Sequence, residues 1–223
     1  MSRLSYMKRN SIKPGPNENP GKIGIRNGVL FFGVMVMAAF LIGCGGGGGG
    51  GGNDATPALE GSFVDSPVEG LEYMTNSQSG ITDMNGTFRY RDGESVRFSL
   101  GGLDLGEALG HPIMTPVDLV EGAVDETHPM VTNMARFLQT LDADMNPANG
   151  ISITEEVAGL MLNHTINFNM SVEDFGNDPN HIMFMDALNA MDPSDPMHFM
   201  VSGADARNHL RNAMMQNGVG GMS

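Results

Sequence analysis

Between residues 59 and 106 the apolar positions come in short runs that are separated by turn residues. In residues 88–91 and again in residues 96–100, aromatic or aliphatic side chains alternate with arginine or serine, which is the period of a strand buried on one face. Asp92-Gly93 separates the two runs. They therefore predict a β-hairpin with one apolar face and one face that carries arginines. Further short strands are predicted at 61–65 and 71–75.

Beyond residue 106 the apolar spacing lengthens to that of a helix. Apolar residues at 130, 134, 137, 138 and 141 follow Pro129, as on one face of an amphipathic helix that begins at the proline. Thr154, Ser171 and Ser202 each precede acidic residues, the arrangement of a helix N-cap, and Pro179 predicts one more helix. The pattern predicts an α+β chain: a small antiparallel β-sandwich followed by an all-helical region of four to five short helices.

An uncharged apolar run, Val29–Ile42, lies near the N-terminus after six basic residues and a single acidic one. A basic region followed by a short apolar core is typical of an export signal. The run holds 14 residues, whereas a helix needs roughly 20 to span a bilayer. A signal helix is therefore predicted here, and a permanent transmembrane helix is the weaker alternative.

The tetrapeptide Leu41-Ile42-Gly43-Cys44 ends this run and contains the only cysteine of the chain. It resembles the lipobox of bacterial lipoprotein precursors. The resemblance implies cleavage between Gly43 and Cys44 and anchoring in the lipid bilayer through an acylated Cys44. Eight glycines follow and predict a disordered tether, which disfavours the alternative of a buried thiol. Gly45, in place of the aspartate that retains such proteins in the inner membrane, implies the outer membrane, on its periplasmic face or at the cell surface.

A second resemblance begins at Val64-Asp-Ser-Pro-Val-Glu-Gly70 and continues through Thr82-Asp-Met-Asn-Gly-Thr-Phe-Arg-Tyr90. These segments are similar to the prealbumin-like, carboxypeptidase-regulatory-like β-sandwich modules of uncharacterised envelope lipoproteins. Such modules serve as spacers or as binding units, so the resemblance implies a fold more than an activity. The expected organisation is a signal peptide at 1–43, the acylated cysteine and tether at 44–58, a β-sandwich module at 59–108 and a helical region at 109–223.

The part of the chain that follows Cys44 is strongly acidic. It holds six arginines, no lysine and 25 acidic residues, a formal charge of −19. Such a charge argues against nucleic acid as a partner and against docking on anionic lipid headgroups. The partners that remain are the bilayer, through Cys44, and an envelope protein or glycan.

The best candidate ligand site is the loop that contains Asp142, Asp144, Asn146 and Asn149. Oxygen-bearing side chains at alternate positions open a calcium loop. Pro147 at the sixth position and Ile153 at the twelfth depart from that pattern, and Asp and Asn are also ordinary turn residues. Calcium and a metal-free connector therefore both remain open.

Catalytic motifs are scarce in the sequence. No Gly-x-Ser-x-Gly elbow is present, and the six histidines are scattered, so we predict no enzyme activity. His181 and His209 are expected in capping or surface roles. Methionines near His181 and His198 could bind copper, but their helical spacing favours core packing.

We expect a membrane-anchored envelope lipoprotein that acts as a binding or structural module. The alternatives are a calcium-dependent adhesion protein and an accessory part of a lipase-like or transport system.

Overall fold

The computed structural model describes residues 57–191 and 197–219. The predicted signal peptide, Cys44 and the glycine tether lie outside the described residues. Within the described part, no helix is both long enough and apolar enough to cross a membrane. The described residues all belong to one compact unit that spans 52–223, so the β-rich and helical halves are parts of a single body.

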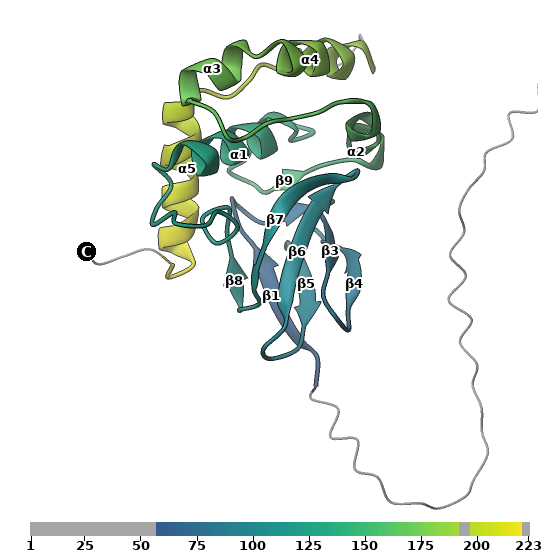
Figure 1. The fold of residues 1–223 in the computed structure, drawn as a ribbon, viewed down its shortest axis with the longest axis vertical. Coiled ribbons are helices and arrows are strands. Elements are labelled where there is room, and N and C mark those ends of the chain that lie inside the picture. The colour runs from purple at the N-terminus through teal and green to yellow at the C-terminus, as the bar shows by residue number, and fades with distance from the viewer. Residues whose placement is uncertain (1–56, 192–196, 220–223) are drawn as a thin grey trace, which may run out of the picture. The chain divides into compact units, whose positions relative to one another are not determined.

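Two larger sheets, besides a pair of two-residue strands, form most of the β-rich half (Figure 1). One contains β5 (Thr87–Tyr90), β1 (Leu59–Phe63) and β8 (Ile113–Met114), and the other contains β4 (Ser79–Ile81), β3 (Glu72–Met74), β6 (Ser95–Leu100) and β7 (Leu103–Leu109). The sheets pack face to face through aromatic rings. The ring centroids of Phe63 and Phe98 lie 4.7 Å apart, and those of Phe88 and Phe98 lie 5.2 Å apart.

The predicted hairpin around Asp92-Gly93 is wrong. β5 pairs with β1, whereas β6 pairs with β3 and β7, so the Asp92-Gly93 turn carries the chain from one sheet to the other. The prediction of an apolar face is confirmed, because Phe88, Tyr90 and Phe98 are buried. An alternating strand reveals which side is buried but not which strand it pairs with, since both sheets offer an apolar face.

Two strands lie beyond residue 108, inside the region expected to be all-helical. β8 pairs in parallel with β1, and β9 (Ile151–Ser152) pairs in parallel with β2 (Val68–Glu69). The strands are therefore not all antiparallel, and the helical half contributes backbone to the sheets. The coarse α+β description holds, because the described part combines these sheets with five α-helices.

The helices begin where the caps in the sequence predict. They are α1 (Pro129–Thr140), α2 (Glu155–Leu160), α3 (Val172–Asn177), α4 (Pro179–Met191) and α5 (Gly203–Gln216), with a 3₁₀ turn at Met161–Asn163 after α2. Thr154, Ser171 and Ser202 each accept a hydrogen bond from the backbone N–H three residues later. These bonds satisfy N–H groups that a helix start leaves without partners.

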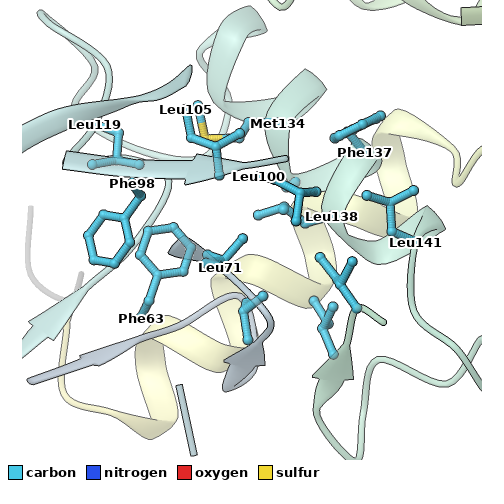
Figure 2. Packing of buried hydrophobic residues seen from close by; sticks show 14 of the residues in the cluster. Phe63, Leu71, Phe98, Leu100, Leu105, Leu119, Met134, Phe137, Leu138 and Leu141 are labelled. Carbon is cyan, nitrogen blue, oxygen red and sulfur yellow. The ribbon is translucent and has the colours of Figure 1, made fainter. Parts of the chain in front are cut away.

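α1 is amphipathic as predicted, but its polar face is buried as well as its apolar face. Every residue from Val131 to Thr140 is buried. Its apolar side chains join residues of both sheets in a single hydrophobic cluster (Figure 2). Its polar side chains bond to the surrounding segments. Asn133 donates to the carbonyls of Phe168 and Met170, and Arg136 donates to those of Val172 and Val201. The polar face of α1 therefore anchors loops instead of facing water.

Candidate functional site

The loop after α1 brings the predicted calcium ligands together. Asp142 accepts hydrogen bonds from the backbone N–H groups of Asn146 and Ser152, at 2.8 and 3.0 Å. Asp144 accepts from the N–H of Asn146 and from the side chain of Asn149, at 2.9 and 2.8 Å. The carboxylate oxygens thus already bond within the loop, and a calcium ion would have to replace these bonds.

The two carboxyl groups of this loop differ in their surroundings. Asp142 is buried, and the loss of water around it raises its pKa, with a further rise from the neighbouring Asp144. The pKa of Asp144 is lowered, chiefly by the hydrogen bond from Asn149. Among the described residues, no group of three or more Asp, Glu, His or Cys side chains is arranged to hold a metal ion. Calcium binding at Asp142, Asp144, Asn146 and Asn149 therefore stays a prediction.

A hollow of about 430 Å³ lies beside this loop, between the edge of the β4–β3–β6–β7 sheet and the start of α2. We call it the larger hollow. Its acidic lining residues are Glu69, Glu72 and Glu155, and its apolar ones include Ile81 and Ile153. A volume of this size falls within the range of ligand sites in proteins. Its full lining consists of Glu69, Gly70, Glu72, Ile81, Thr82, Ser152, Ile153, Thr154, Glu155 and Ala158.

A smaller hollow of about 260 Å³ adjoins it and shares Glu69 and Ser152 with it. Asp142, Asp144 and the exposed side chain of Met84 contribute to its lining. The hydroxyl of Ser152 donates to Glu69 at 2.8 Å, so this pair stands between the two hollows. Together the hollows carry five carboxyl groups, and no arginine or histidine lines either one.

The turn between β1 and β2 forms a second polar cluster, which sequence reasoning missed. Asp65 is fully buried, and both of its carboxyl oxygens lie near the side-chain nitrogen of Gln139, at 2.9 and 3.1 Å. Burial raises the pKa of Asp65 well above its ordinary value. Ser66 takes the left-handed backbone conformation, with φ of 56°, which is uncommon for a residue other than glycine.

Ser66 also contacts the last helix. Its hydroxyl lies 2.9 Å from Nε2 of His209, 143 residues further along the chain. Burial lowers the pKa of His209, which favours the neutral ring. For His181, of the predicted capping or surface roles, the surface role is wrong: the side chain is buried on α4 against Phe175, its Nδ1 lies near the Phe175 carbonyl oxygen, and burial lowers its pKa.

A scan against protein-family models, a search of curated proteins and a search of solved structures each returned no match.

The sequence signals that point to these sites differ in kind. The Asp142 loop could be predicted from the sequence because its polar residues lie within a few positions of one another. The larger hollow joins segments around residues 70, 81 and 154, and Ser66 and His209 lie at opposite ends of the described chain. The Ser66-Pro67 turn was the only local sign of the second cluster, since spacing along the sequence does not show which distant segments meet.

Proposed function

We propose that this protein is a lipid-anchored envelope lipoprotein that presents a non-catalytic binding module. The observation that carries the anchor is Leu41-Ile42-Gly43-Cys44, followed by the glycine run. A tether of eight glycines would span roughly 15 Å by flexible-chain scaling. An acylated Cys44 would hold the module near the outer membrane, with more than one lipid chain for stable anchoring.

The adjoining hollows support the binding role. They lie at the junction between sheet and helices, where ligand sites commonly form, and they combine carboxyl groups with apolar side chains. The segments that line them come from both halves of the compact unit. The module as a whole, prealbumin-like by its resemblance, would then bind an envelope protein or glycan rather than act only as a spacer.

The anchor is tested by replacing the cysteine in the full chain, expressed in a bacterial host. We expect the unaltered protein in the membrane fraction and labelled by palmitate. Cys44→Ser should lose the label and leave the membrane fraction, because the thioether cannot form. Gly46→Ser is the matched control, since it changes the neighbouring tether but keeps the thiol, and it should behave like the unaltered protein.

Membrane retention of Cys44→Ser would contradict the proposal and favour the apolar run as a permanent membrane anchor. The mass of the mature N-terminal peptide gives an independent measurement. A peptide that still carries residues 29–43 would argue against cleavage before Cys44.

A further inference from the structure

Within residues 57–191 and 197–219, the carboxyl groups of the two hollows form no ion pair with an arginine. Among the described residues, the arginine ion pairs join Arg89 to Glu60, Arg97 to Asp104 and Glu107, and Arg211 to Glu126. None of these pairs includes Glu69, Glu72, Asp142, Asp144 or Glu155. The fold thus pairs other acidic side chains with arginines. The carboxyl groups of the hollows form no such ion pair, so this concave surface carries negative charge.

The arrangement of these carboxyl groups disfavours a single small cation. A metal ion needs several ligands converging on one point, and in the described part no three Asp, Glu, His or Cys side chains are arranged in that way. Instead the carboxyl groups are distributed over two adjoining hollows on segments that reach from Glu72 to Glu155. Charges spread in this way match a ligand that carries several separated positive charges.

The rim of the hollows is apolar and lies beside an edge strand of the four-stranded sheet. Ile81 and Met84 are 67% and 74% exposed, one on each hollow. Ile81 ends β4, the outermost strand of its sheet, which pairs on one side with β3. An edge strand offers backbone N–H and C=O groups to an added chain. Contacts through peptide N–H and C=O groups are what a polypeptide supplies and a simple polyamine lacks.

From these observations we propose that the two hollows bind an extended basic segment of a partner protein. Its lysine or arginine side chains would meet Glu69, Glu72 and Glu155 in the larger hollow and Asp144 in the smaller one. Its apolar side chains would pack on Ile81 and Met84. This inference deepens the binding role proposed above and rests on it, but it does not depend on the lipid anchor.

The test uses the purified full chain in detergent and a fluorescein-labelled peptide with the sequence Lys-Ser-Ile-Lys-Ser-Ile-Lys. Fluorescence anisotropy should show saturable binding that weakens as salt is added, because screening reduces the attraction between charges. The triple variant Glu69→Gln, Glu72→Gln, Glu155→Gln should raise Kd by about tenfold or more. Glutamine keeps the acceptor oxygens that Ser152 and Ser99 use, so the fold should be retained.

The matched control removes the same number of negative charges from the surface outside the two hollows. Glu121→Gln, Glu173→Gln and Asp186→Asn replace exposed acids that line neither hollow, and their Kd should equal that of the unaltered protein. Equal weakening in both triple variants would overturn the proposal, because it would reveal attraction to the overall negative charge.

Four further outcomes complete the test. The absence of saturable peptide binding would overturn the proposal. Displacement of the peptide by calcium chloride that is abolished by Asp142→Asn would also overturn it, in favour of a metal site. If the triple variant of the hollows loses its cooperative thermal transition, the double variant Glu72→Gln, Glu155→Gln is measured instead. Both of its side chains are exposed, so the fold should tolerate the change. If the protein binds the peptide but proves not to be anchored through Cys44, only the proposal of a lipid anchor is contradicted.

Discussion

The contact between Ser66 and His209 shows how a single hydrogen bond joins the first and last parts of the described chain. Ser66 follows the buried Asp65, and His209 lies on α5. Gln139 on α1 donates both to Asp65 and, at 3.3 Å, to the carbonyl oxygen of Ala206 on α5. Three distant segments are thus held together by polar atoms that would be costly to leave unpaired when buried.

The lowered pKa of His209 predicts a loss of stability in acid. In the unfolded chain its pKa is near 6.5, and in the folded protein it is lower. As the pH falls below about 6.5, the unfolded state takes up the proton first, so the free energy of unfolding decreases until the pH passes the folded value. His181 adds to this decrease in the same direction. Asp65, whose pKa is raised, acts oppositely, because its ionisation penalises the folded state as the pH rises above 3.8.

Comparison of variants isolates the contribution of His209 to the pH dependence of the free energy of unfolding. The free energy of unfolding, measured by urea titration at about pH 7 and pH 5, should fall less in His209→Gln than in the unaltered protein. The difference is limited to about 1.4 kcal/mol for each unit of pKa shift. An unchanged slope in His209→Gln would contradict this account.

At the scale of elements, the helix starts and the positions of strands β1, β3, β5 and β6 followed from local signals. The other strands and all strand partners did not. The caps at Thr154, Ser171 and Ser202 were predicted correctly, because capping involves residues three apart. The Asp92-Gly93 turn was recognised, but its role in joining two sheets was not. Pairing depends on which distant strand offers a complementary edge, and the alternating pattern is the same in either sheet.

Gly70 provides a test of how tightly the elements around the larger hollow are packed. Its φ is 95°, and a Cβ at this position would lie 2.2 Å from the carbonyl oxygen of Ile153. Gly93 has a similar φ of 84°, but a Cβ there would meet nothing within 4 Å. Gly93→Ala should therefore cost about 1–2 kcal/mol for the left-handed backbone alone. Gly70→Ala should cost a further 1–3 kcal/mol or so for the overlap.

Urea titration of the two alanine variants measures these costs. The comparison holds the backbone conformation nearly constant, so the difference reports the contact between Gly70 and the segment that follows β9. Equal destabilisation of both variants would show that Ile153 can move away without cost. Gly70→Ala should also weaken peptide binding, because it displaces one wall of the larger hollow.

For the whole molecule, the enclosure of α1 predicts a single cooperative unfolding transition. The sequence favoured a boundary near residue 108, yet one hydrophobic cluster joins α1 to both sheets. The described chain contains no tryptophan, and its tyrosines, Tyr73 and Tyr90, both lie in the sheets. Tyrosine fluorescence therefore reports on the sheets, while circular dichroism at 222 nm reports mainly on the helices.

The two signals should give the same melting midpoint if the sheets and helices unfold together. A helical transition that precedes the tyrosine transition would instead support two independent domains. Phe137→Ala in α1 should lower both midpoints together, since its ring is fully buried in the shared core. The replacement should cost about 3–5 kcal/mol.

The sequence by itself determined the α+β class, the positions of most helices and the buried faces of β5 and β6, because these depend on propensity, capping and periodicity over a few residues. It also supplied the entire argument for an anchor at Cys44. Only the tertiary structure decided that α1 is enclosed, that β5 and β6 belong to different sheets and that unpaired carboxyl groups gather around two hollows. These features depend on contacts between residues far apart in the chain, and such contacts are set by the packing of the whole core rather than by any local pattern.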